Sequence, residues 1–208
     1  MFMTTRIPAA MLSCVVTWST ALAGSIDAAS QSIANPVLRA ELLQRAERDQ
    51  AVRREFIQNG ADRPNEDVVA RGRVIDAENL SRLKAIVAKY GWPGPELVGK
   101  DGSEAAFLLL QHADLAFQKE MLPVIEAAYR AQQTSGQNYA LLTDRVLVRE
   151  GKPQRYGTQF QVRNRDLVPD PIEAEAAVDQ RRAAVGLPPL AEYLQLMREM
   201  YFPNRGPG

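Results

Sequence analysis

The stretch Ser103–Gln118 constrains the fold of this chain more than any other part of the sequence. Outside the first two dozen residues it is the most apolar helical run, and it contains His112, the only histidine of the chain. His112 falls on the same helical face as Leu108 and Leu109, and Phe107 widens that face until the helix is apolar on nearly every side. A histidine in this position is either a hydrogen-bonded residue of the core or part of a site.

The first 23 residues have the features of a secretory signal peptide. Arg6 is the single basic residue of this segment, an uncharged apolar stretch follows it, and Ala21-Leu22-Ala23 offers a small-residue cleavage site. The alternative is an uncleaved membrane anchor, but the apolar stretch is shorter than the ~20 residues that a spanning helix needs. A lipoprotein attached through Cys14 is less favoured, because few apolar residues precede the cysteine. We expect a periplasmic or secreted protein with no integral membrane span after cleavage.

Cleavage of the signal peptide excludes several kinds of catalytic and metal site from the mature chain. It removes Cys14, the only cysteine, so the mature chain has no disulfide, no thiolate nucleophile and no cysteine-ligated zinc. A single histidine also argues against a typical catalytic zinc site, whereas a calcium or magnesium site built only from carboxylates stays open. No phosphate-binding loop or dinucleotide fingerprint occurs, so we predict no cofactor and no metal. The balance of 25 basic and 25 acidic residues predicts no nucleic-acid partner.

Helical periodicity dominates the rest of the chain. The composition, 46% hydrophobic and 24% charged, is typical of a soluble globular domain. We expect residues 24–34 to form a flexible lead-in, residues 35–201 a single helical domain, and residues 202–208 a loose tail. The predicted fold is mainly α: a compact single-domain bundle of about six or seven helices, with one short strand or hairpin near residues 154–168.

Capping residues, prolines and glycines set the predicted helix boundaries. Asn35-Pro36 predicts the start of a long first helix that ends near Asn59-Gly60 and exposes its charged face, including Arg53, to solvent. We expect a loop over residues 60–72 and a second helix that starts near Asp76. Residues 92–102 are predicted to be non-helical because of their prolines and glycines, and a capping box of Asp101 and Glu104 would start the next helix.

The second half of the chain alternates between helices and one extended segment. Tyr156, Thr158, Phe160 and Val162 alternate with polar neighbours, which predicts a half-buried strand, and Leu167-Val168 would form the second arm of a hairpin. Asp114 suits the N-cap of a helix. The further helices that we expect are Leu115–Gln133, Gln137–Glu150, Glu173–Val185 and Pro189–Tyr201.

Several short segments, in this order along the chain, resemble one protein family. Together they are similar to the bacterial family catalogued as domain of unknown function 6624, and the resemblance extends from about Asn35 to Met200. One difference is that Asp114 is followed more closely by Ala116-Phe117-Gln118 than in the family pattern. The resemblance implies a mainly helical domain without an established activity, so it assigns no catalytic residue. The segments are Asn35–Leu43, Arg48–Arg53, Asp76–Asn79, Gly91–Pro93, Gln111–Asp114, Leu142–Arg145, Gln154–Gln159 and Arg181–Leu190.

Seven polar side chains lie in or beside apolar segments and are the candidate site. Burying each of them without a partner would cost about 1–3 kcal/mol, so they must contact one another or a ligand. In one hypothesis they form a closed network, in which Asp114 or Asp144 pairs with an arginine and His112 bonds a backbone carbonyl or Tyr156. In the other they line a pocket. The seven residues are His112, Asp114, Asp144, Arg145, Arg155, Tyr156 and Gln159.

The pocket hypothesis has two functional versions. In the first, the protein is a binding or interaction module, and Arg145, Asp144, Arg155, Tyr156 and Gln159 bind a small anionic or polar molecule or a peptide. In the second, it is a small metal-independent hydrolase, with His112 as general base and Asp114 or Asp144 as its orienting partner. No Gly-x-Ser-x-Gly motif occurs, so such an enzyme would activate water directly. The sequence does not predict an oligomeric state.

Overall fold

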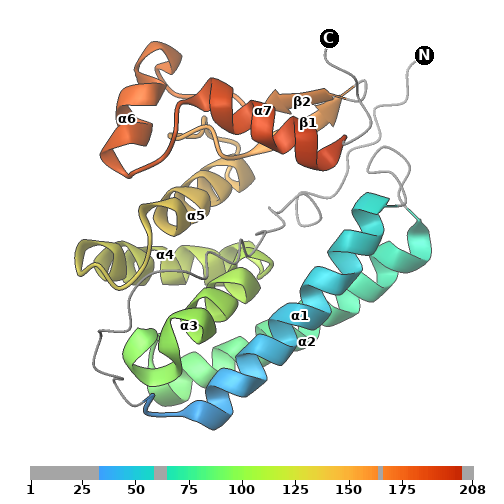
Figure 1. The fold of residues 1–208 in the computed structure, drawn as a ribbon, viewed down its shortest axis with the longest axis vertical. Coiled ribbons are helices and arrows are strands. Elements are labelled where there is room, and N and C mark those ends of the chain that lie inside the picture. Colours follow the sequence, from blue (N-terminus) through green and yellow to red (C-terminus); the bar gives the residue numbers. More distant parts are fainter. Residues whose placement is uncertain (1–32, 59–64, 164–165, 203–208) are drawn as a thin grey trace, which may run out of the picture.

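The computed structural model describes residues 33–58, 65–163 and 166–202. These residues form a mainly α single domain of seven α-helices, one short 3₁₀ helix and one two-stranded hairpin, which confirms the predicted fold class (Figure 1). The predicted signal peptide, most of the lead-in and nearly all of the predicted tail lie outside the described residues. Among the described helices, none is both long and apolar enough to cross a membrane.

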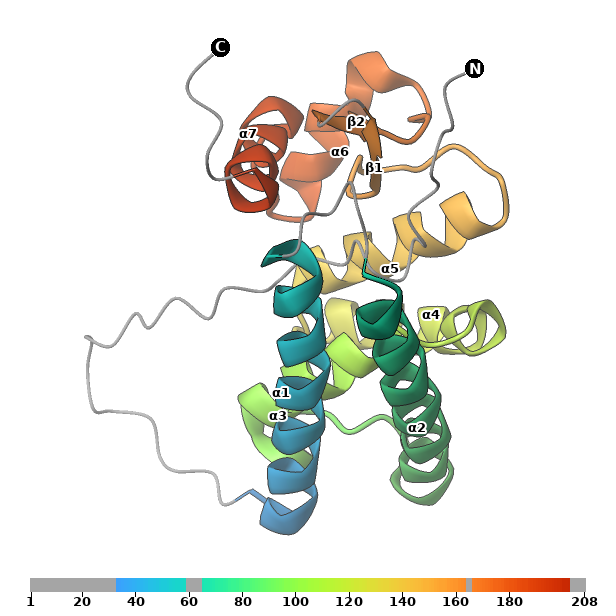
Figure 2. The same ribbon diagram turned by 90° about the vertical axis from the view of Figure 1, so that its right-hand side faces the viewer.

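Two long antiparallel helices, α1 (Pro36–Gln58) and α2 (Glu66–Tyr90), form one side of the molecule (Figures 1 and 2). Asn35 caps α1 as predicted, since its Oδ1 accepts a hydrogen bond from the Leu38 N–H at 3.0 Å. The start of α2 was predicted too late, because Asn65 accepts the Asp67 N–H and the helix begins at Glu66. The expected loop over residues 60–72 is therefore wrong for residues 66–72. Within residues 66–72 only Val68 and Gly72 are buried, which are too few positions to show a helical period in the sequence.

Helix α3 (Pro95–Gln111) packs across α1 and includes residues that were predicted to be non-helical. Gly94 caps it and Pro95 takes the first helical position, where its missing N–H costs nothing. Gly99, at a φ of 74°, forms a kink inside the helix, a conformation that glycine adopts without strain. The predicted capping box does not form, because Asp101 accepts a hydrogen bond from Arg39 Nε at 2.8 Å. Proline and glycine here start and bend a helix instead of preventing one.

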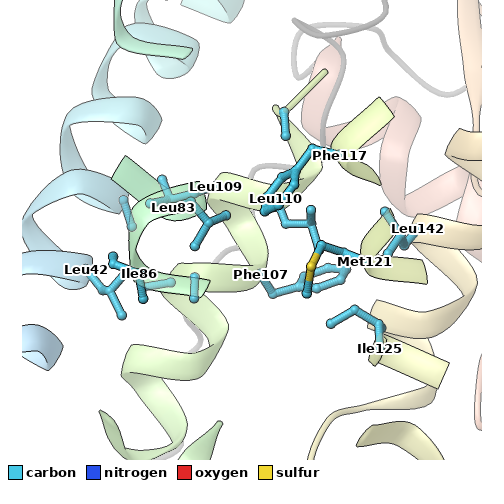
Figure 3. Close-up of a cluster of buried hydrophobic side chains, with 14 of the residues drawn as sticks. Leu42, Leu83, Ile86, Phe107, Leu109, Leu110, Phe117, Met121, Ile125 and Leu142 are labelled. Atoms are coloured by element: carbon cyan, nitrogen blue, oxygen red, sulfur yellow. The ribbon is translucent and has the colours of Figure 1, made fainter. Parts of the chain in front are cut away.

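The main hydrophobic core lies between the first five helices, which include α4 (Leu115–Arg130) and α5 (Gly136–Arg149) (Figure 3). Asp114 caps α4 by accepting the Phe117 N–H at 2.7 Å, and Ser135 caps α5. The stretch Ser103–Gln118 contributes many of the buried residues of this core, as its composition predicts. The core residues labelled in Figure 3 are Leu42, Leu83, Ile86, Phe107, Leu109, Leu110, Phe117, Met121, Ile125 and Leu142.

The C-terminal part forms a second, smaller hydrophobic cluster with the end of α1. It contains an antiparallel hairpin of β1 (Phe160–Arg163) and β2 (Asp166–Pro169), followed by a 3₁₀ turn, α6 (Val178–Ala184) and α7 (Leu190–Tyr201). The predicted strand is therefore shorter than expected, because residues 154–159 form a turn. The buried residues of this cluster are Val52, Phe56, Val68, Phe160, Leu167, Tyr193, Met197 and Tyr201.

Candidate functional site

Helix α1 carries a buried polar segment between the two hydrophobic clusters. Ala46 belongs to the main core and Val52 to the second cluster, and Asp49 and Arg53 lie at the boundary, both fully buried. The prediction that the charged face of this helix is solvated is therefore wrong for Arg53. Its guanidinium stays buried because Asp49, one helical turn earlier, faces the same side and accepts its hydrogen bonds.

Four side chains from three elements meet here, and we call them the Asp49 cluster: Asp49 and Arg53 from α1, Asp76 from α2, and His112 from the end of α3. His112 Nδ1 lies 2.8 Å from Oδ1 of Asp49. Arg53 donates from Nε to Oδ2 of Asp49 at 3.0 Å and from Nη2 to Oδ1 of Asp76 at 2.6 Å. One oxygen of each aspartate and one nitrogen of His112 lie within 4.8 Å of one another. The guanidinium thus joins two carboxylates that both approach the imidazole.

Burial and neighbouring charges fix the protonation of the Asp49–His112 pair. Burial, reinforced by the positive charge of Arg53, lowers the pKa of His112 to about 4, so the imidazole is neutral near pH 7. Burial opposes ionisation of Asp49, but His112 and Arg53 outweigh it and hold the pKa of this carboxyl well below its usual range. An ionised carboxylate can only accept hydrogen bonds, so the imidazole proton lies on Nδ1. Nε2 therefore carries a lone pair.

Asp76 differs from the rest of the Asp49 cluster in its exposure and its acidity. Its side chain is 16% exposed, whereas that of His112 is 1% exposed. Burial, together with the nearby carboxylate of Asp49, raises the pKa of Asp76 to about 6, although Arg53 opposes this shift. Asp76 is therefore the member through which the cluster contacts solvent, and it is the one that titrates closest to neutral pH.

Several buried polar atoms in or beside the cluster have no hydrogen-bond partner among the described residues. They include Nε2 of His112, Oε1 of Gln50 and both amide atoms of the Gln111 side chain. Gln50 is in direct contact with the cluster, since its Nε2 donates to Oδ2 of Asp49 at 3.1 Å. Buried polar groups without partners are uncommon and cost about 1–3 kcal/mol each. The residues around Asp49 therefore retain capacity for hydrogen bonding or coordination that the protein itself does not use.

Asp144, one of the predicted ligand-binding residues, forms a second buried network. It is fully buried on α5, and its carboxylate accepts the backbone N–H groups of Arg155 at 2.7 Å, Tyr156 at 2.9 Å and Thr158 at 2.9 Å. The Thr158 hydroxyl donates a fourth bond at 2.9 Å. Burial raises the pKa of Asp144 despite these bonds. We call Asp144 and residues 154–159 the Asp144 turn, and its geometry explains why this segment is not a strand.

Three other predicted ligand-binding residues also lie in or beside the Asp144 turn. Tyr156 is buried with its ring 6.2 Å from that of Tyr139, and the exposed guanidinium of Arg155 lies 6.0 Å from the Tyr156 ring. Gln159 donates from Nε2 to the Thr158 hydroxyl oxygen at 3.1 Å. The structure thus brings Asp144, Arg155, Tyr156 and Gln159 together around one turn.

The other predicted residues, His112, Asp114 and Arg145, do not bond to the Asp144 turn in any contact that we describe. Asp114 caps α4 and lies 3.2 Å from the ammonium of Lys84, so it does not orient His112. Arg145 is buried and donates from Nη1 to the backbone oxygen of Gln111 at 3.2 Å, which fixes the end of α3 next to His112. The hydrogen-bonded partner of His112 is Asp49 instead of either predicted aspartate.

Asp49, Arg53 and Asp76 were not predicted as site residues, yet α1 contains a signal for two of them. The buried positions of this helix run Leu42, Ala46, Asp49, Arg53 and Phe56, so charged residues interrupt an apolar stripe in the correct helical register. A charged pair one turn apart inside such a stripe indicates a buried pair. The participation of Asp76 has no comparable signal, because it depends on the packing of α2 against α1.

The fold and this cluster define a class of protein: a mainly helical single domain with a buried aspartate–histidine pair that is hydrogen-bonded to an arginine. The chain belongs to the family of unknown function DUF6624, whose match covers residues 36–204. The resemblance inferred from the short segments is thereby confirmed. No curated protein and no solved structure matches the chain.

Proposed function

We propose that the protein is a binding module and that the Asp49 cluster is its site for a small polar ligand. The observation that supports this proposal is the approach of two carboxylates and a neutral imidazole within 4.8 Å, in a buried position with one guanidinium between them. When both aspartates are ionised, the four side chains sum to one negative charge, and Arg145 and Arg149 act on His112 and Asp76 from outside the cluster. Because Nε2 of His112 and Oε1 of Gln50 are acceptors without a described partner, a ligand that supplies hydrogen-bond donors complements the cluster.

Native mass spectrometry of the purified protein tests this proposal. We expect a bound mass that disappears on denaturation and that is lost or reduced in Asp76→Asn. Glu78→Gln is the matched control, because Glu78 is on the same helix, pairs with Arg48 at 3.2 Å and lies outside the cluster. A native mass equal to that of the bare chain would count against the proposal.

A hydrolase with His112 as general base is the second candidate. It is favoured by the orientation of the imidazole, since Asp49 accepts the Nδ1 proton and Nε2 keeps its lone pair. In this version Asp49, in place of Asp114 or Asp144, orients the base, and water is the nucleophile. Hydrolysis of p-nitrophenyl esters by the wild type, abolished in His112→Asn and retained in Glu78→Gln, would support the enzyme. Equal rates in all three proteins would exclude it for these substrates.

We also propose that the protein is secreted or periplasmic, on the basis of the signal peptide predicted from the first 23 residues. N-terminal sequencing of protein from the extracytoplasmic fraction should begin at Gly24. An intact N-terminus in a membrane fraction would indicate the uncleaved anchor instead.

A further inference from the structure

We propose that the ligand of the Asp49 cluster is a divalent transition-metal ion, such as Zn²⁺, coordinated by Asp49, Asp76 and His112. This inference rests on the binding function proposed above and makes its ligand class specific. It differs from the expectation drawn from the sequence, where a single histidine and no cysteine in the mature chain argued against zinc. The spatial approach of Asp76 to a buried histidine was not visible in the sequence.

The donor set is the first argument for a transition metal. Two carboxylate oxygens and one imidazole nitrogen converge from three helical segments, with ligand atoms within 4.8 Å of one another. The 2.8 Å between His112 Nδ1 and Asp49 Oδ1 is compatible with two ligands that share one ion, since each lies about 2.0–2.2 Å from the metal in zinc sites. Coordination by Nδ1 requires that the imidazole proton move from Nδ1 to Nε2. Calcium and magnesium prefer oxygen ligands alone, whereas imidazole suits zinc and its neighbours.

The second argument concerns the hydrogen bonds of His112. Metal binding would break none that His112 makes to a residue outside the cluster. Its Nδ1 bonds only Asp49, itself a proposed ligand, and its Nε2 has no partner among the described residues although the side chain is 1% exposed. A histidine held by a closed structural network would have both nitrogens engaged. Nε2 is therefore open to the proton that leaves Nδ1 when Nδ1 binds the ion.

Arg53 is compatible with this site as a partner of its ligands. It bonds Oδ1 of Asp76 at 2.6 Å and both oxygens of Asp49, Oδ2 from Nε at 3.0 Å and Oδ1 from Nη2 at 3.1 Å. The ion would therefore bind Oδ1 of Asp49 through the lone pair that now accepts His112 Nδ1, and Asp76 through its other oxygen. Carboxylates that bind metals are themselves hydrogen-bonded in most sites, and such outer partners fix the ligand geometry. The positive charge of Arg53 lowers the affinity of the site for a cation, as do the charges of Arg145 and Arg149, which act on His112 and Asp76, and the two carboxylates oppose this effect.

Zinc titration of the EDTA-treated, ¹⁵N-labelled protein tests this inference, because the chain has one histidine and its imidazole signals need no assignment. We expect one Zn²⁺ per chain in native mass spectra and imidazole nitrogen shifts that saturate at one equivalent. Asp76→Asn should weaken binding at least about tenfold, and Glu78→Gln should bind as the wild type does. Mg²⁺ should leave the imidazole signals unchanged.

A second variant covers the case in which Asp76→Asn fails to fold. His112→Asn keeps a donor toward Asp49 and lacks the ring, and it should also bind zinc at least about tenfold more weakly. If Zn²⁺ leaves the imidazole signals unchanged, or if Asp76→Asn and Glu78→Gln bind zinc equally, the metal inference is wrong. If zinc does not bind but the purified protein carries another molecule that Asp76→Asn releases, the binding function stands without the metal. If neither is found, both proposals fail.

Discussion

Asp49 and Asp144 are both fully buried aspartates on helices of the same core, but their surroundings differ. Asp144 accepts four hydrogen bonds from backbone N–H groups and a hydroxyl of one nearby turn. Asp49 instead contacts the charged or titratable side chains Arg53 and His112, which come from two helical segments. Asp144 stabilises a turn, whereas Asp49 belongs to a cluster in which buried polar atoms have no described partner.

The comparison shows that burial of a carboxylate does not by itself indicate a site. In the Asp144 turn, every bond that we describe to the carboxylate comes from groups that keep the same charge at all relevant pH values. In the Asp49 cluster, two partners titrate, and Nε2 of His112 remains without a described partner. Substitutions in the Asp144 turn should therefore change stability without changing ligand binding, whereas substitutions in the Asp49 cluster should change binding as well.

The largest effect is expected for Asp144→Ala. It leaves the N–H groups of Arg155, Tyr156 and Thr158 without their acceptor, and we expect the free energy of unfolding to fall by about 3–5 kcal/mol. Urea denaturation measures this loss. Asp144→Asn keeps one acceptor oxygen and should cost clearly less. A loss of under about 1 kcal/mol for the alanine variant would show that the Asp144 turn is not held by this carboxylate.

The next effect concerns the pH dependence that His112 contributes. Its pKa is about 4 in the folded protein and 6.5 in the reference state, so the unfolded chain takes up the proton first as pH falls. Relative to His112→Asn, the wild type should therefore lose up to about 3 kcal/mol of stability between pH 7 and pH 4. Urea denaturation at several pH values provides the comparison. A constant difference between the two proteins would mean that the imidazole pKa is not shifted.

Asp76 should contribute a pH dependence of the opposite sign. Its pKa is raised from 3.8 to about 6, so the folded state holds this proton more tightly than the unfolded state does. The stabilisation is present near pH 4 and is lost as pH rises through 6, by about 2 kcal/mol after allowance for partial exposure. Wild type should therefore lose stability relative to Asp76→Asn between pH 4 and pH 7. A change in the other direction would indicate that Arg53 dominates the environment of Asp76.

The smallest expected effect is a difference in stability between two variants that replace either Nδ1 or Nε2 of His112. At pH 7 the amide introduced by His112→Asn can replace Nδ1 as donor to Asp49, whereas His112→Gln places its amide nearer to the position of Nε2. Because Nε2 has no described partner, His112→Asn should be more stable than His112→Gln by about 1 kcal/mol in urea denaturation. If the glutamine variant is the more stable, Nε2 rather than Nδ1 makes the structural bond.

Much of the fold follows from the sequence because its signals are local. Apolar periodicity and caps such as Asn35 predict the main helices, and the alternation around Phe160 predicts one arm of the hairpin. The predicted helix boundaries are wrong where a residue type occurs in more than one kind of local structure. Proline and glycine near Gly99 belong to a kinked helix, and the start of α2 buries only Val68 and Gly72 within residues 66–72, so its sequence resembles that of a loop.

The candidate site is less predictable, because it depends on contacts between distant segments. The polar residues of the 154–159 segment stand out in the sequence, but their side chains do not show that the backbone of this segment is what Asp144 binds. His112 was singled out from its position on an apolar face, whereas its partner lies 63 residues away on α1. Only the packing of α1, α2 and α3 brings Asp49 and Asp76 to the imidazole.

The most direct test of the difference between the two aspartates is the ¹⁵N spectrum of the single imidazole in metal-free protein at pH 7. We expect a neutral ring with its proton on Nδ1 and an unprotonated Nε2, which remains neutral as the pH is lowered to about 5. A ring that is protonated on both nitrogens at pH 7, or that carries its only proton on Nε2, would contradict the assignment of the Asp49 cluster as a site with a free imidazole lone pair.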